Sequence, residues 1–528
     1  MILRRFLLVL ILFACSAAPA AEESPAAPRE PGAFPPAPDA RILEGLSAIH
    51  QGRFGEGQAR FRAFLDGDPA DPRGHLFLAF SEWWRLLQLR GVQESAALEF
   101  HLEEAIRLAR ARLEQNAEDP ETLANLGTGY IFLAQYRAAQ RRVLRAAMAA
   151  KKGKGFLERA LKHDSDLTDG LFGLGAYNYY ADKVNALVKG IRTALFLPGG
   201  NSELGLSQLE EVSEKGRYFR TEAHLLLAII MQGRHERRYL KAQEHLRAAL
   251  ALNPGSPVFL MSLGELQIRL GRYPEAQATL RKAADAAHLS RDPDRAELAW
   301  LSQILLSDSL DLSLQCASAL RELTSSLNAK DIQPDFRERA LAVATRSATR
   351  IGDLHSLERI YDELGVEAAD RALLQERHGT PRLQEGLVRG IEAALDLQEA
   401  GRWEEAARLL EELPSGNPAS AEVGLHLAII FFEQGKWREA ETKLRQIPDT
   451  GAGGVPGWIG GWRNLYLGRS LVEQGKKAEG KAFYRRAAET EGFRAKDLAR
   501  ALLGPEGDDP DLWPRRVFAP PRPPQKSR

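Results

Sequence analysis

Apolar residues recur at three- and four-residue spacing along most of the 528-residue chain, and no stretch alternates strictly between apolar and polar positions. In the segment from Tyr273, for example, Ala276, Leu280 and Ala283 lie on the same side of a helix with about 3.6 residues per turn. Ala, Leu, Glu and Arg are abundant, which favours the same conformation. The pattern predicts an all-α fold built from amphipathic helices.

The helical pattern itself repeats at a fixed interval. Four apolar positions that begin at Tyr239 recur 34 residues later, beginning at Tyr273. An independent set that begins at Trp403 recurs at Trp437 with the same offset. A constant period of this length is typical of an array in which each unit buries, against its neighbours, an apolar stripe that it cannot bury alone.

Five short stretches share the order Gly, Arg or Lys, any two residues, Glu, and Ala or Gly. Glycine adopts positive φ without steric cost, so it can end one helix and turn the chain back. The glutamate then falls in the first turn of the next helix, where the helix dipole favours an anion. The pattern therefore predicts tight turns between paired helices, beginning at Gly52, Gly271, Gly401, Gly435 and Gly475.

This order of residues resembles the tetratricopeptide repeat. The Leu263-Gly264 pair, followed by Gly271 and Tyr273, matches its first helix and turn, and Leu126-Gly127 with Tyr130 gives an earlier copy. The resemblance implies a right-handed solenoid of antiparallel helix pairs. It also implies that the first helix of each pair lines a concave face, where such proteins usually bind peptides or partner domains.

Changes in composition divide the chain further. An unusual apolar stretch interrupts the repeats; it is either an additional helix that covers the solenoid or an element that faces a partner or a membrane. The predicted divisions are a signal peptide (1–20), a Pro/Ala-rich linker (21–39), an N-terminal repeat array (40–290) with an insertion (182–201), variant helical hairpins (291–384), C-terminal repeats (385–505) and a basic, Pro-rich tail (506–528).

The first residues have the order of a secretory signal: Arg4 and Arg5, then an apolar run from residue 6 to 14, then small residues. Two forms of processing remain open. Cleavage after Ala20 would remove the signal, whereas the sequence ending at Cys15 resembles a lipobox, in which that cysteine becomes the lipidated N-terminus. Both predict export to the periplasm or the outer membrane of a bacterium.

Charge and cysteine content narrow the function. The 71 basic and 71 acidic residues balance, which gives no reason to expect nucleic acid or anionic lipid as a partner. Cleavage would leave Cys316 alone, so we predict no intramolecular disulfide and a buried role for this thiol. The 11 histidines show no metal-binding spacing. We therefore predict no cofactor, no metal and no catalytic residue.

The predicted function is a non-catalytic protein–protein interaction scaffold or adaptor of the bacterial envelope. Two alternatives remain: a lipid-anchored outer-membrane component of an export or assembly machine, and an envelope enzyme with its site in the variant hairpins. The resemblance places the partner-binding side chains on the first helices, and aromatic residues are the favoured anchors. The expected contact residues are Asn125, Arg269, His426, Phe432, Trp462, Tyr466 and Arg469.

Overall fold

A computed structural model shows helices joined by turns, and the residues it describes contain no strand. The prediction of an all-α fold is confirmed. Among these residues, no helix has both the length and the apolar composition needed to cross a bilayer. The described residues are 37–90, 95–183, 199–288, 293–313, 315–326, 334–378, 385–399, 401–413, 419–449, 455–491 and 495–513.

The chain divides into two compact units. Unit 1 comprises Met1–Met231, Ala242–Ser262 and Lys282–Ala299, and unit 2 comprises Gln232–Lys241, Leu263–Arg281 and Trp300–Arg528. The last segment of unit 1 ends at residue 299, and the predicted end of the N-terminal repeat array is residue 290.

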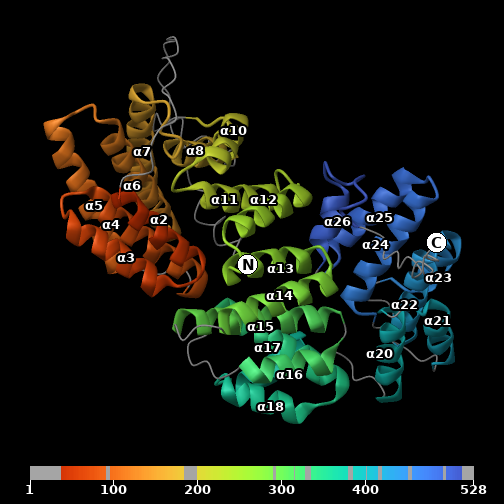
Figure 1. Ribbon diagram of the computed structural model, residues 1–528. Helices are drawn as coiled ribbons and strands as arrows, with labels where there is room; N and C mark the ends of the chain where they lie inside the picture. The colour runs from red at the N-terminus through yellow and green to blue at the C-terminus, as the bar shows by residue number, and fades with distance from the viewer. Residues whose placement is uncertain are drawn as a thin grey trace, which may run out of the picture. The chain divides into compact units, whose positions relative to one another are not determined.

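Unit 1 begins with consecutive helices that pack in antiparallel pairs: α2 with α3, α4 with α5, α6 with α7, and α8 with α10 (Figure 1). Helix α10 follows the predicted insertion and pairs with α8; residues 184–198 of the insertion lie outside the described residues. The bounds are α2 Ala37–His50, α3 Phe54–Gly67, α4 Pro72–Arg85, α5 Ala96–Gln115, α6 Pro120–Ala139, α7 Val143–His163, α8 Gly170–Lys183 and α10 Ser202–Lys215.

Helices α11 to α26 follow along the chain. In unit 2, α16 pairs with α17, α20 with α21, α22 with α23, and α24 with α25. The bounds are α11 Arg220–Gln232, α12 Tyr239–Leu252, α13 Pro257–Arg269, α14 Tyr273–His288, α15 Pro293–Leu312, α16 Cys316–Ser326, α17 Pro334–Ile351, α18 Leu354–Glu363, α19 Ala368–His378, α20 Glu385–Glu399, α21 Trp403–Glu412, α22 Ala419–Glu433, α23 Trp437–Gln446, α24 Gly457–Glu473, α25 Lys477–Glu489 and α26 Lys496–Leu502.

The predicted turn glycines adopt the expected left-handed backbone. Their φ angles are 73° at Gly52, 69° at Gly271, 74° at Gly401, 75° at Gly435 and 83° at Gly475. The basic residue and the glutamate of the motif also have a shared role. Arg402, for instance, forms an ion pair of 2.6 Å with Glu405 across the first turn of α21. The motif is therefore a turn whose basic residue and glutamate form an ion pair at the start of the second helix.

Small residues allow the paired helices to cross closely. A Cβ atom added at Gly153 of α7 would lie 2.9 Å from the carbonyl oxygen of Gly127 on α6, and one added at Gly127 would lie 3.0 Å from the carbonyl oxygen of Gly153. No side chain fits at that distance unless the helices move apart. In contrast, a Cβ added at Gly155, two residues further along α7, would meet nothing within 4 Å.

The two ends of the packed region differ from the predicted boundaries. Helix α2 begins at Ala37, so the last residues of the predicted linker are helical. At the other end, the Glu506 carboxylate accepts hydrogen bonds from the backbone N–H groups of Leu240 and Lys241, at 2.8 and 3.1 Å, and Leu512 is fully buried. The predicted tail therefore begins too early. The signal peptide, Cys15 and residues 514–528 lie outside the described residues.

These glycines provide a matched test of the crossing. Gly153→Ala should destabilise the protein by about 1 to 3 kcal/mol, because the added methyl group has no space between α6 and α7. Gly155→Ala should stabilise it by up to about 1 kcal/mol, since alanine has the higher helix propensity and the position is open. Urea unfolding followed by circular dichroism measures both changes. Equal midpoints for the two variants would contradict the close crossing.

Candidate functional site

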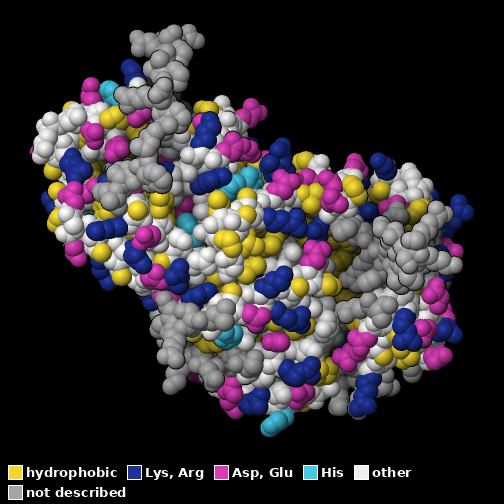
Figure 2. All heavy atoms as spheres, in the orientation of Figure 1, with side chains coloured by type: hydrophobic (Ala, Val, Ile, Leu, Met, Phe, Trp, Pro, Cys, Tyr) yellow, Lys and Arg dark blue, Asp and Glu magenta, His cyan; other side chains and the backbone are white. Residues whose placement is uncertain are grey.

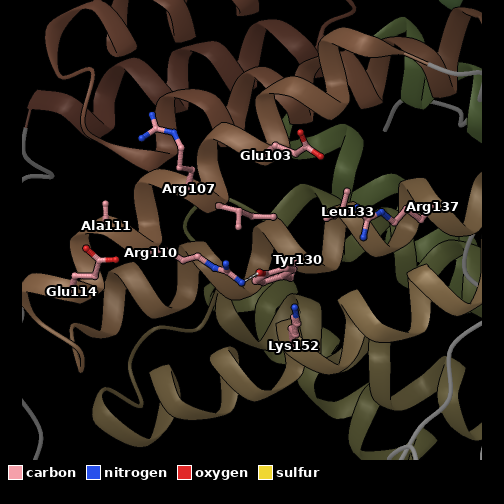
Figure 3. Close-up of a pocket in the computed structure, with 10 residues that line it drawn as sticks. Glu103, Arg107, Arg110, Ala111, Glu114, Tyr130, Leu133, Arg137 and Lys152 are labelled. Atoms are coloured by element: carbon pink, nitrogen blue, oxygen red, sulfur yellow. Dashed lines mark hydrogen bonds between the residues drawn. The ribbon is translucent and has the colours of Figure 1, made fainter. Parts of the chain in front are cut away.

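A groove of about 610 Å³ opens among α5, α6 and α7 of unit 1 (Figure 3). Helix α5 supplies most of one wall, α6 supplies the floor, and α7 contributes one lysine. The lining residues are Glu103, Ile106, Arg107, Arg110, Ala111, Glu114, Tyr130, Leu133, Arg137 and Lys152.

The sequence of α5 explains why its polar side chains face this groove. The helix buries an apolar stripe that includes Leu98, Leu102 and Ala109. The charged residues of the wall recur at three- and four-residue spacing on another side of the same helix, so they form a polar stripe. Ser95 fixes the start of the helix, because its side chain accepts a hydrogen bond from the backbone N–H of Leu98.

Tyr130 forms the centre of the floor. Its ring is almost buried and stacks on Phe156, with the centroids 5.9 Å apart and an interplanar angle of 7°. Arg110 donates a hydrogen bond to the Tyr130 hydroxyl group. The cationic groups of Arg110 and Lys152 lie 5.7 and 5.6 Å from the centre of the ring (Figure 3). The aromatic ring therefore holds two positive charges at the floor of the groove.

Cations outnumber carboxylates along the groove. Four lining residues are basic and two, Glu103 and Glu114, are acidic. Arg107 is already paired with Glu104 at 2.7 Å, and this hydrogen bond lowers the pKa of the Glu104 carboxyl group. Arg137 and Lys152, in contrast, form no ion pair with any residue that the structure describes. The groove thus offers positive charge that the described protein groups do not neutralise.

Of the residues expected to bind a partner, Asn125 is the one in unit 1. It lies half-buried on α6 and does not line the groove. The repeat pattern therefore does not predict the groove, although it includes Tyr130 as the aromatic residue of one repeat. The groove depends on three helices from two consecutive pairs, and spacing within one helix does not reveal it.

Four of the expected residues meet in unit 2, where two of them are buried and two are partly buried. Phe432 and Tyr466 are 3% and 5% exposed, and their rings contact that of Trp513 at 6.4 and 5.0 Å. Trp462 packs on Tyr466 at 6.0 Å, and the Arg469 guanidinium lies 5.5 Å from the Trp513 ring. Trp513 of the C-terminal segment thus packs on Phe432 and Tyr466, which leaves little of these two aromatic side chains exposed, and a role for the four residues in partner binding stays a prediction.

Arg269 and His426 are also engaged within unit 2. Arg269 forms an ion pair of 2.7 Å with Asp497 and donates a hydrogen bond of 2.6 Å to Gln232. His426 is 6% exposed. Neither side chain offers much surface to a partner, which differs from the expectation that they line an open face.

Comparison with known proteins agrees with the turns and helix pairs. Residues 234–305 and 397–454 match the model of a tetratricopeptide repeat family, and these ranges contain the turns at Gly271, Gly401 and Gly435. These two segments are tetratricopeptide repeats. No curated protein sequence matches the chain significantly.

Solved structures similar to this protein are distant. The P58(IPK) TPR domain is 14% identical, with 88% of this chain and 96% of that chain covered and a TM-score of 0.21. Human IFIT1, solved as a dimer with m7Gppp-AAAA, is 12% identical, with 85% and 89% covered and a TM-score of 0.27. Yeast Tom70 is 12% identical, with 90% and 98% covered and a TM-score of 0.22.

The variant hairpins contain a buried ionic cluster in which opposite charges are paired. Arg339 contacts Asp308 at 2.7 Å, and Arg346 contacts Asp311 at 2.6 Å. The hydroxyl group of Ser347 donates a further hydrogen bond of 2.7 Å to Asp311. Each carboxylate is thus neutralised by an arginine, as in an ionic cluster that fixes helix packing.

Cys316 is buried in the same region, as predicted. Burial, with a contribution from Asp311, raises the pKa of its thiol to about 12. The thiol therefore stays protonated at neutral pH, and a protonated thiol is a poor nucleophile.

Two histidine pairs link helices in unit 1. The Nδ1 atoms of His75 and His101 lie 2.9 Å apart, and those of His224 and His245 lie 3.1 Å apart. One nitrogen of each pair must donate and the other accept, which requires at least one neutral ring. Burial lowers the pKa of His101 and of His224 to about 4. Among the described residues, no set of three metal-ligating side chains surrounds either pair.

The histidine pairs predict that acid destabilises unit 1. Between pH 6.5 and about 4 the unfolded chain binds protons at His101 and His224 that the folded chain does not, so stability falls as the pH falls. Urea unfolding at pH 7.5 and pH 5.0 measures this loss. The double variant His101→Gln/His224→Gln should lose less stability between these two pH values than the parent. His355→Gln, at an exposed histidine of α18, is the matched control; an unchanged pH dependence in the double variant would contradict the assignment.

Proposed function

We propose that this protein is a non-catalytic scaffold that holds an acidic, extended segment of a partner protein in the groove among α5, α6 and α7. The observation that carries the proposal is the set of four cations that line the groove. Three of them, Arg110, Arg137 and Lys152, have no ion pair among the described residues. A repeat array supports a binding role because its outward faces can vary while the helix crossings stay fixed.

The groove has complementary features for such a segment. Guanidinium groups bind carboxylates through paired hydrogen bonds, so Arg110 and Arg137 suit acidic side chains. Tyr130, Ile106 and Leu133 form an apolar floor beneath these cations and are themselves buried. A volume of about 610 Å³ also lies within the range of about 300 to 1,000 Å³ that is usual for ligand sites. We therefore infer that the bound segment is rich in acidic residues.

A fluorescein-labelled octapeptide of alternating Glu and Leu tests the groove by fluorescence anisotropy. The double variant Arg137→Gln/Lys152→Gln should bind it at least about tenfold more weakly, because hydrogen bonds to charged groups contribute about 1.5 to 3 kcal/mol each. The same peptide with Gln in place of Glu should bind weakly to every variant.

The matched control is Arg62→Gln/Lys162→Gln, which removes the same charges from exposed positions of unit 1 outside the groove. This control should keep the affinity of the parent protein. Equal losses in the two double variants would show a general charge effect and would contradict binding in the groove.

We also propose that the protein acts in the bacterial envelope, after export directed by its N-terminal segment. The support is the order of Arg4 and Arg5, the apolar run and the small residues that end at Ala20. Lipidation at Cys15 would make the protein an anchored component of the outer membrane, and cleavage after Ala20 would make it a free periplasmic protein.

Labelling of growing cells with radioactive palmitate separates these two forms. A labelled protein whose signal disappears in Cys15→Ala would establish the anchored form. An unlabelled protein found in the periplasmic fraction would establish cleavage. Recovery of the protein in the cytoplasm alone would contradict the proposed export.

A further inference from the structure

Helix α7 exposes a stripe of apolar and basic side chains on the side away from its packed face. Leu144 and Met148, one helical turn apart, are 59% and 54% exposed. Arg145 and Lys151 of α7 are also exposed, and Arg141 is exposed in the turn that precedes the helix. We call these five residues the α7 stripe. Exposed apolar side chains at successive turns are unusual on a helix that otherwise packs well, so the stripe calls for a function.

The stripe lies in a segment of one charge sign. Between Glu121 and Glu158 the chain contains no acidic residue. The same segment contains the basic residues Arg137, Arg141, Arg142, Arg145, Lys151, Lys152 and Lys154. The balanced charge of the whole chain therefore conceals a local excess of positive charge on and beside α7.

The cations of the α7 stripe form no ion pairs within the described structure. Arg141, Arg145 and Lys151 form no ion pair with any residue that the structure describes. Elsewhere in unit 1 an arginine next to a turn is paired, as Arg53 is with Glu56 at 2.5 Å. The stripe thus keeps its cations available to an external anion.

Arg141 occupies a backbone position that favours glycine. Its φ angle is 59°, and it stands in the turn between α6 and α7 where Gly52 and Gly271 stand in other turns. A side chain in this left-handed region is unfavourable relative to glycine. A non-glycine residue with this backbone suggests a use for its side chain, and the exposed Arg141 stands three residues before Leu144 in the sequence.

We propose that the α7 stripe docks on the surface of an anionic lipid bilayer. Leu144 and Met148 would enter the interfacial layer, and the three cations would contact lipid phosphates. Over most of the face drawn in Figure 2, basic and acidic side chains are interspersed, as on protein surfaces generally. An anionic membrane is instead uniformly negative, and it matches a stripe that carries one sign of charge together with apolar side chains. The proposal does not depend on peptide binding, because no stripe residue lines the groove.

A site-specific fluorescent label tests this contact in the full-length chain. An environment-sensitive nitrobenzoxadiazole group is attached to Met148→Cys, in a Cys15→Ser background where the remaining Cys316 is buried. Vesicles of phosphatidylglycerol should shift the emission to the blue and increase it, whereas vesicles of phosphatidylcholine should not. The matched control carries the label at Leu373→Cys, on an equally exposed residue of α19 (62%), and should not respond.

The stripe cations are then removed in the labelled protein. Arg141→Gly/Arg145→Gln should weaken binding to phosphatidylglycerol vesicles roughly twentyfold, since each cation near an anionic surface contributes about fivefold. Arg62→Gln/Lys162→Gln, with the same loss of charge, should leave binding nearly unchanged. Folding is checked by urea unfolding, in which Arg141→Gly should keep or raise the midpoint because glycine favours this backbone.

Three outcomes would overturn the proposal. The first is the absence of any response at position 148 to phosphatidylglycerol. The second is an equal response at positions 148 and 373, which would show that the protein contacts the vesicles without a preferred orientation of α7 toward the bilayer. The third is a response at position 148 to the acidic octapeptide but not to the vesicles, which would assign the stripe to an acidic protein.

Discussion

The close crossing of paired helices is the constraint on which the rest of the structure depends. At Gly127 and Gly153, and again at Gly468 and Gly480, the carbonyl oxygen of one helix lies 3.0 Å or less from the place where a Cβ of the other would be. Such contacts fix the distance and register of each pair, because there is no space for a side chain to slide through. The exposed side chains on the outward faces can then differ from one helix pair to the next.

The features that the sequence predicted correctly are those decided within one repeat. The φ angle of Gly271 follows from the need to reverse the chain at once, and the burial of Tyr239 and Ala276 follows from helical spacing. The burial of Tyr466 against Trp513 could not be predicted in this way. It depends on Trp513, which follows 47 residues later and outside the repeat pattern. Contacts between distant segments, such as the walls around Tyr130, leave no periodic signal in the sequence.

The net charge of the whole chain also conceals local differences in charge. A balance of 71 basic and 71 acidic residues argues against anionic partners when charges mix over one surface. In an array of helix pairs, each outer helix face is a separate surface with its own balance of basic and acidic residues. On α5 the cation of Arg107 is matched by Glu104 one turn away, whereas the exposed cations of α7 have no acidic residue within their segment before Glu158. The net charge of each exposed helix face is therefore the quantity that indicates the charge of a partner.

Helix α7 connects the two proposed surfaces through its own packing. Its buried face consists of small residues, among them Ala146, Ala150 and Gly153, so the helix lies close against α6. This short distance brings Lys152 over the Tyr130 ring, while the exposed Met148 is one turn away. A rigid helix cannot shift one of these side chains without shifting the other. A membrane held by the stripe would therefore fix the position of the groove relative to the bilayer, and a segment bound in the groove would be presented close to the lipid surface.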